Sequence, residues 1–258
     1  MSVNTRAVIL AVSVSSALLG CVGWRVYASR NLPVPQYEIL EDRSGSHPDG
    51  CSSLVGLAEQ IVQKEPATSK SQVTILIVGD RTTANEPLPL AKYPIPRTRK
   101  AIEGRAAGLH RQQDLLADLL QRCHGVRSTT VSPIFFGIVE ALADLRAQGC
   151  RQTSGCRLYV DSDGEENVNL GIRQALSGTQ KAHQALPDSA DNGGIEVDFC
   201  GLAVSGTGIT DSSHVTSTVV HDTVREDRLQ RTWRLLFTEP ALVSFEPFCP
   251  KVSSLASE

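Results

Sequence analysis

The sequence contains no Cys-x-x-Cys pair, no internal repeat and no large excess of either charge. Without cysteines at metal-ligand spacing, a zinc domain is not expected. A formal net charge of −3 over 258 residues provides no general attraction to nucleic acid. The six histidines stand at no metal-binding or catalytic-triad spacing, so we interpret them as surface or local hydrogen-bonding residues.

A nucleotide-binding loop is also missing. Residues 201–208 are rich in glycine but lack the lysine of a P-loop. We interpret them as a strand-to-loop transition that leads into a loop at residues 205–218. The Pro-rich residues 81–96 are expected to form an extended loop or a hairpin.

The apolar content of 41% is sufficient for one large α/β domain. Short apolar runs predict strands at residues 37–41, 72–79, 157–161 and 195–204, and helical spacing predicts helices at residues 52–62, 101–123, 133–145 and 222–237. This alternation predicts a doubly wound, mostly parallel central sheet flanked by helices in three layers, with ligands at the carboxyl ends of the strands. We expect the domain to span residues 37–250, after a signal or anchor segment with its tether (1–36) and before a flexible tail (251–258).

Three small oxygen-bearing residues follow the first expected strand. Asp42, Ser44 and Ser46 stand at alternate positions, so a bend in the chain could turn all three toward one point. A carboxylate and two hydroxyls suit a hard divalent cation such as Mg²⁺, which prefers about six oxygen ligands.

Two further segments offer side-chain oxygen atoms that could bind the same cation. Asp163 follows the strand at residues 157–161 and precedes a glycine turn. Ser132 is expected to be the N-cap of a helix that starts at Pro133. These segments occur in the order strand-end D-x-S-x-S, helix-start hydroxyl, strand-end S-D-G.

In this order the three motifs resemble the metal-ion-dependent adhesion site of the von Willebrand factor type A domain family, over roughly residues 37–245. The resemblance implies that Ser44 and Ser46 are direct ligands of Mg²⁺, Mn²⁺ or Ca²⁺, and that Asp42 and Asp163 bind it directly or through water. The family's third loop supplies a threonine, where this chain offers Ser132, with Thr130 as the alternative. The resemblance also implies an open position on the cation for an acidic side chain of a protein partner, and no enzyme activity.

Two other functions remain open. The pair Asp161 and Asp163 also resembles the strand-end D-x-D motif of haloacid-dehalogenase-type phosphatases, in which Asp161 would be the nucleophile and Asp163 the general acid. That motif normally opens its fold, and Glu165 stands where a small hydroxyl residue is expected. The other alternative is a structural or assembly scaffold with a vestigial metal site, which makes contacts through the Pro-rich segment.

The N-terminus indicates a membrane tether. Arg6 precedes an apolar run at residues 7–20, and a small residue then precedes Cys21. This arrangement resembles a bacterial lipoprotein signal, in which Cys21 becomes the lipidated first residue. The alternative is an uncleaved anchor helix that continues through Trp24, although about eighteen residues is near the lower limit for spanning a bilayer. Either interpretation places the domain on the periplasmic or cell-surface side of a membrane.

The remaining cysteines agree with export. Six cysteines other than Cys21 form an even set, which in an exported chain suggests up to three disulfides. Cys150 and Cys156 could close a small loop before the Asp163 strand. The expected pairs for the other four are Cys51 with Cys123 and Cys200 with Cys249.

Overall fold

A computed structural model describes ten stretches of the chain: residues 34–44, 50–64, 71–78, 88–94, 105–126, 131–151, 155–166, 168–177, 189–211 and 214–250. The expectations for Cys21, the signal or anchor segment and the C-terminal tail lie outside these residues. Two candidate ligands, Ser46 and Thr130, lie outside them as well.

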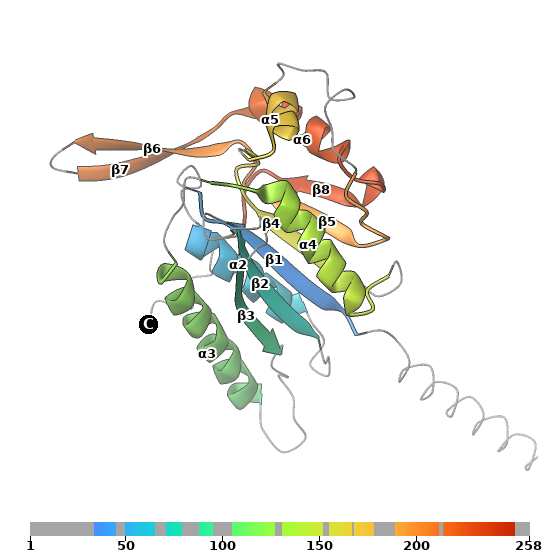
Figure 1. Ribbon diagram of the computed structural model, residues 1–258. Coiled ribbons are helices and arrows are strands. Elements are labelled where there is room, and N and C mark those ends of the chain that lie inside the picture. Colours follow the sequence, from blue (N-terminus) through green and yellow to red (C-terminus); the bar gives the residue numbers. More distant parts are fainter. Residues whose placement is uncertain are drawn as a thin grey trace, which may run out of the picture. The chain divides into compact units, whose positions relative to one another are not determined.

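The described residues form a central sheet of six strands in the order β3-β2-β1-β4-β5-β8 (Figure 1). Five neighbouring strands run parallel, and β3 pairs antiparallel with β2 at one edge. The strands are β1 (Gln36–Asp42), β2 (Gln72–Val78), β3 (Leu88–Pro94), β4 (Arg157–Asp161), β5 (Glu196–Cys200) and β8 (Val243–Glu246). This is the doubly wound, mostly parallel α/β sheet expected from the sequence.

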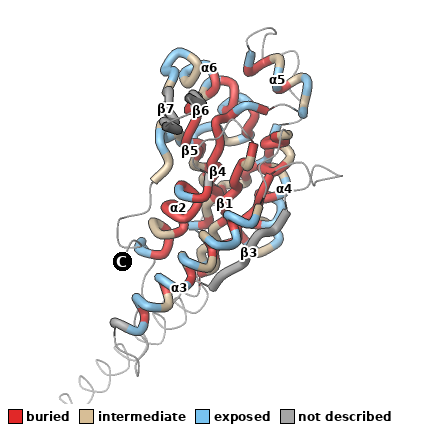
Figure 2. Tube along the Cα trace, turned by 90° about the vertical axis from the view of Figure 1, so that its left-hand side faces the viewer, coloured by how far each residue is buried: buried red, intermediate tan, exposed pale blue. Residues whose placement is uncertain are grey.

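Helices cover both faces of this sheet. They are α2 (Gly50–Lys64), α3 (Arg105–His124), α4 (Ile134–Ala147), α5 (Leu170–Leu176) and α6 (Thr223–Arg234), and a 3₁₀ turn (Pro240–Leu242) precedes β8. One apolar core lies between α2, α3 and the sheet, and a second lies between α4, α6 and the opposite face. Figure 2 shows the buried residues concentrated along the strands, with the helices exposed on their outer sides.

The alternation of side chains along β1 explains how this strand contributes residues to both apolar cores. Because successive side chains of a strand point to opposite faces, Ile39 packs toward α2 and Leu40 packs toward α4. Helix α4 lies close to the sheet at Gly137, where an added Cβ would stand 2.8 Å from Val78 Cγ2. A glycine at this position therefore allows the close approach that brings the start of α4 to the end of β1.

Two expectations about the C-terminal half were wrong. The strand expected at residues 195–204 ends at Cys200, because Gly201 (φ 81°) and Ala203 (φ 58°) adopt left-handed backbone conformations that turn the chain. The segment expected to be a loop at residues 205–218 instead forms a hairpin of β6 (Val204–Asp211) and β7 (His214–His221), which pair over eight positions. The many β-branched residues of this segment favour strands, although its glycines also fit a loop.

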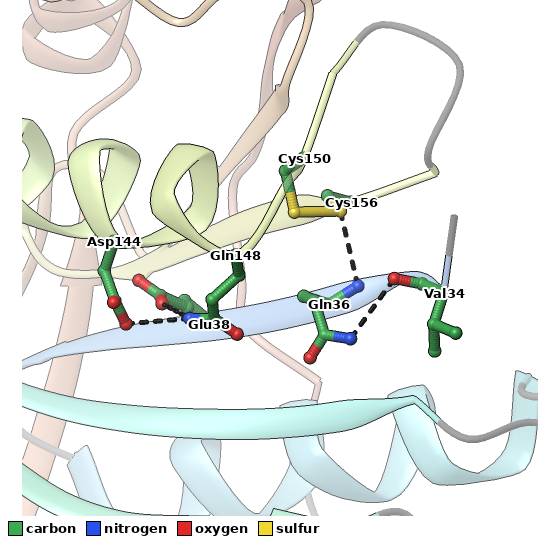
Figure 3. The surroundings of a disulfide bond; sticks show 7 residues. All are labelled: Val34, Gln36, Glu38, Asp144, Gln148, Cys150 and Cys156. Carbon is green, nitrogen blue, oxygen red and sulfur yellow. Dashed lines mark hydrogen bonds between the residues drawn. A yellow bond between two sulfur atoms is a disulfide. The ribbon is translucent and has the colours of Figure 1, made fainter.

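Three disulfides join Cys51 to Cys123, Cys150 to Cys156 and Cys200 to Cys249. These are the pairs named from the sequence. The first links α2 to α3, and the second closes the turn between α4 and β4, where the Gln36 backbone N–H at the start of β1 points toward Cys156 Sγ at 3.4 Å (Figure 3). Three disulfides indicate an oxidising environment.

Candidate metal site

The three sequence motifs meet at one edge of the sheet. Because β1 and β4 are parallel neighbours, with Glu41 opposite Asp161, their carboxyl ends lie side by side. Asp42 is the last residue of β1, and Ser162 and Asp163 directly follow β4. Ser132 lies two residues before α4, and its side chain reaches the end of β1.

Asp42 is the centre of this arrangement. Its Oδ2 accepts hydrogen bonds from the hydroxyls of Ser132 and Ser162, both at 2.8 Å. Its Oδ1 accepts a hydrogen bond from the Ser44 backbone N–H at 2.9 Å. One carboxylate thus joins its own loop to the loops that precede α4 and follow β4. A serine hydroxyl that donates its single proton to Asp42 keeps its lone pairs for another partner.

The expected capping role of Ser132 was wrong. Helix α4 starts at Ile134 with Pro133 at the N-cap, and no side chain of the N-cap residue makes a capping hydrogen bond. The Ser132 hydroxyl bonds to Asp42 instead, because Ser132 stands one position too early for a cap and faces the end of β1.

Glu166 replaces the missing cap. Its Oε2 accepts a hydrogen bond from the Phe135 backbone N–H in the first turn of α4 at 2.9 Å. Its Oε1 accepts hydrogen bonds from the backbone N–H groups of Val168 (2.8 Å) and Asn169 (3.1 Å) before α5. Burial raises the pKa of this carboxyl above its ordinary value, and the three backbone donors offset only part of that rise. Glu166 could not be recognised from the sequence, since no local pattern relates it to a helix about thirty residues earlier.

The loop after β4 is shaped by its glycine. Asp163 is fully buried, and its Oδ1 accepts a hydrogen bond from the Glu165 backbone N–H at 3.0 Å. Gly164 adopts φ 81°, and a Cβ there would stand 2.3 Å from Leu202 Cδ2. The Gly164 carbonyl accepts a hydrogen bond from Trp233 Nε1 at 3.1 Å. Helix α6 thereby fixes the loop that carries Asp163.

A second acidic pair lies on the opposite face of the same strands. Glu41 and Asp161 are both fully buried, and their carboxyl groups contact each other. Burial, followed by the negative charge of Asp161, raises the pKa of Glu41 well above its ordinary value. Asp161 Oδ1 also lies 2.9 Å from Cys249 Sγ.

The candidate ligands in the loops at the carboxyl ends of β1 and β4 and before α4 suit a hard cation. Asp42, Ser44, Ser132 and Asp163 are each 6% exposed or less, and all four offer oxygen atoms. Magnesium and manganese prefer such ligands. The carboxylates of Asp42 and Asp163 supply negative charge, and the hydroxyls add neutral oxygens.

Another cluster of potential ligands within the described residues has a different chemistry. One ligand atom each from Asp161, Cys200 and Cys249 lies within 4.8 Å of the others. The two cysteines are joined as a disulfide, and a disulfide offers no thiolate to a metal. In the oxidised protein this cluster is therefore not a metal site.

Comparisons with known proteins give only a structural likeness. No protein-family model matches the sequence, and no curated protein matches it. Proximal thread matrix protein 1 from the mussel byssus is similar at 10% identity and a TM-score of 0.41, over 88% of this chain and 46% of that one. Manganese-loaded TRAP protein from Plasmodium vivax is similar at 14% identity and a TM-score of 0.39, over 85% and 74%.

This chain thus spans about half the length of the mussel protein. At these scores neither likeness carries an argument about function. The strand order and the helices on both faces define the class: a three-layer α/β domain, the fold that the resemblance to von Willebrand factor type A domains implied. Its candidate metal site lies at the carboxyl ends of β1 and β4.

Proposed function

We propose that this domain binds a divalent cation, Mg²⁺ or Mn²⁺, and through it a protein partner that offers an acidic side chain. The ligand set is Asp42, Ser44, Ser46, Ser132 and Asp163. The observation that carries the proposal is the position of Asp42, whose Oδ2 accepts both the Ser132 and the Ser162 hydroxyl at 2.8 Å. Three loops from distant parts of the chain present small oxygen donors at one point.

The residues present explain why an acidic partner is the proposed one. Serine hydroxyls are neutral, so a cation held partly by them retains more of its positive charge than a cation held only by carboxylates. Bound there, the cation would supply an open coordination position for a carboxylate. The chain's own residues position the hydroxyls and keep Asp42 buried. On this proposal the protein is not an enzyme.

The surface beside the site suits contact with a protein. Val168 and Leu170, in and just after the β4–α5 loop, are 36% and 65% exposed, and Val224 at the start of α6 is 78% exposed. An ion pair between Arg225 and Glu165 holds the start of α6 against the β4–α5 loop, and Figure 1 shows α5 beside α6. Exposed aliphatic side chains around a charged centre are typical of a protein-binding surface.

A calorimetric titration tests the cation site. We would titrate Mg²⁺ and Mn²⁺ into the full chain, into Asp42→Ala, and into Asp227→Ala as a matched loss of an exposed acidic side chain on α6. Saturable binding to the first and third proteins, lost in Asp42→Ala with the fold intact by circular dichroism, supports the proposal. No binding to folded wild-type protein overturns it.

A scaffold function is the second candidate. The hydrogen bonds that Asp42 accepts from the protein stabilise the loops without a cation, as expected of a vestigial site. Metal dependence separates the two functions. Partner capture that is unchanged by a chelator would favour the scaffold, whereas capture that requires Mg²⁺ or Mn²⁺ would favour adhesion through the cation.

We also propose that the N-terminal segment tethers the domain to the exported side of a membrane. The three disulfides support an oxidising location. Among the helices that the structure describes, none is long and apolar enough to cross a membrane. Incorporation of labelled palmitate that is lost in Cys21→Ser supports lipidation. An intact N-terminal methionine in the mature protein contradicts it and favours the uncleaved anchor.

A further inference from the structure

We propose that reduction of the Cys200–Cys249 disulfide creates a second metal site, which binds Zn²⁺ through Cys200, Cys249 and Asp161. This site differs from the candidate cation site at Asp42 in its ligands, and it lies on the opposite face of the sheet. Asp161 and Cys200 end the neighbouring strands β4 and β5 and point toward the side covered by α2.

The distances place three ligand atoms around one point. The Asp161 carboxylate and the two sulfurs all lie within 4.8 Å of one another, and Asp161 Oδ1 is 2.9 Å from Cys249 Sγ. A sulfur in a disulfide carries no proton, so this short contact is not a hydrogen bond. After reduction, a cation bound by both the Asp161 oxygen and the Cys249 thiolate would make these two atoms favourable neighbours.

Glu41 places a further buried carboxyl group beside these three ligand atoms. Its side chain is fully buried, it stands opposite Asp161 in the strand pairing, and its carboxyl contacts the Asp161 carboxyl. Within the described residues no protein donor reaches either Glu41 oxygen. Buried carboxyl groups that contact a ligand orient it and tune its basicity, as the outer partners of metal ligands do. Glu41 is therefore a positioning residue for Asp161.

The sulfur atoms decide which metal is bound. Two thiolates select Zn²⁺ over Mg²⁺, because zinc accepts sulfur at about 2.3 Å whereas magnesium requires oxygen. Three protein ligands leave one of zinc's four positions for water. Cys249 lies in the irregular segment after β8, so its sulfur can separate from Cys200 Sγ without disturbing a strand of the sheet.

The chemical step requires a reductant, which we name as a dithiol. The dithiol transfers two electrons and two protons to the disulfide; the Cys200–Cys249 S–S bond breaks and the dithiol closes to its own disulfide. Zinc then displaces the two thiol protons to solvent as it binds the thiolates. The oxidised protein lacks the site, and the reduced protein gains it.

Cobalt(II) provides a spectroscopic test. We would reduce the full chain with dithiothreitol, remove the reductant under anaerobic conditions, and titrate with Co²⁺, which replaces zinc and gives a sulfur-to-cobalt charge-transfer band in the near ultraviolet. The site at Asp42 has only oxygen ligands and gives no such band. We expect the band in the reduced chain, its absence in the unreduced chain, and its removal by added Zn²⁺.

Variants decide which cysteines are responsible. Cys200→Ser with Cys249→Ser should abolish the band, whereas Cys51→Ser with Cys123→Ser and Cys150→Ser with Cys156→Ser should each retain it. Glu41→Gln should lower the Co²⁺ affinity about 10- to 100-fold, the usual effect of removing an outer partner of a ligand, and Asp161→Asn at least as much. An unchanged band in Asp161→Asn would exclude Asp161 as a ligand.

A second measurement distinguishes a missing metal site from unfolding of the reduced chain. Alkylation with iodoacetamide, mapped by mass spectrometry, reports each cysteine separately. We expect Zn²⁺ to slow the alkylation of Cys200 and Cys249 in the reduced chain and to leave the alkylation rates of Cys150 and Cys156 unchanged. A reduced chain that unfolds and gains no protection from Zn²⁺ overturns the proposal, as does a band equally strong without Cys200 and Cys249.

Discussion

The Ser132 hydroxyl donates a hydrogen bond of 2.8 Å to Asp42 Oδ2 across ninety residues of sequence. Both side chains are buried, so the bond is shielded from water and fixes the start of α4 against the end of β1. The same oxygen of Asp42 accepts the Ser162 hydroxyl. Through these contacts, one carboxylate sets the relative positions of every described loop that carries a candidate ligand.

Replacement of Ser132 tests whether its hydroxyl is a ligand. We expect Ser132→Ala to weaken Mg²⁺ binding roughly 10- to 100-fold, because one oxygen donor and the support of Asp42 are both lost. Ser132→Thr keeps the hydroxyl and should retain saturable binding. Calorimetry on both variants makes the comparison. Equal affinities of the alanine variant and the wild type would exclude Ser132 and favour Thr130.

Replacement of Glu166 tests the link between α4 and α5. Both oxygens of Glu166 accept backbone N–H groups, and Glu166→Gln replaces one of them with an amide nitrogen that cannot accept a hydrogen bond. We expect a loss of about 1–3 kcal/mol in the free energy of unfolding, measured by urea denaturation, together with weaker Mg²⁺ binding. Glu165→Gln is the matched control, since Glu165 is more than half exposed in its ion pair with Arg225 and should cost at most about 1 kcal/mol. Similar losses in both variants would contradict this role.

The pair of Glu41 and Asp161 predicts a pH dependence of stability. The pKa of Glu41 is raised in the folded protein by burial and by Asp161. As pH rises above the ordinary glutamate pKa, the unfolded chain loses this proton while the folded chain retains it. The unfolded state then binds fewer protons, so the contribution of Glu41 to stability falls with rising pH until the folded pKa is reached.

Glu41→Gln removes that titration. We therefore expect the variant to gain stability relative to the wild type as pH rises from about 4 to 7, with the smallest difference at the acidic end. Urea denaturation at a series of pH values measures this. Glu140→Gln, at an exposed position of α4, should give a curve parallel to the wild type. A constant offset between Glu41→Gln and the wild type would show that Glu41 does not titrate differently on folding.

The lengths of the disulfide loops predict unequal contributions to stability. Cys51 and Cys123 are 72 residues apart, whereas Cys150 and Cys156 are 6 apart. Loop-closure entropy assigns about 4 kcal/mol to the first bond and about 2 kcal/mol to the second. Paired serine replacements, compared by urea denaturation, should preserve this order. The reverse order would indicate that native packing around Cys150 and Cys156 outweighs the chain entropy.

Much of the fold follows from local patterns. Short runs rich in apolar residues became β1, β2 and β4, as expected of strands buried on both faces of a parallel sheet. The helices at α2, α3, α4 and α6 carry apolar residues at helical spacing. Short elements escaped this reasoning, because α5 has seven residues and β8 has four, too few to show a period. The β6–β7 hairpin was missed because its glycines and serines also fit a loop.

The candidate site was predictable only in part. Asp42, Ser44 and Asp163 follow apolar strands, so their place at the sheet edge could be read from the chain. Ser162 and Glu166 could not be assigned, because their partners Asp42 and Phe135 lie 120 and 31 residues away. The buried pair Glu41 and Asp161 was hidden for the same reason, since strand register decides which side chains face each other.

The sequence by itself determined the alternation of strands and helices, the oxygen chemistry of the motifs and the even number of cysteines outside Cys21, because each depends on residue type and local spacing. Only the tertiary structure decided that Ser132 bonds to Asp42 instead of capping α4, that Glu166 supplies the cap, and that Asp161 faces a disulfide. Those contacts join residues far apart in the chain, and the order and register of the parallel strands bring them together.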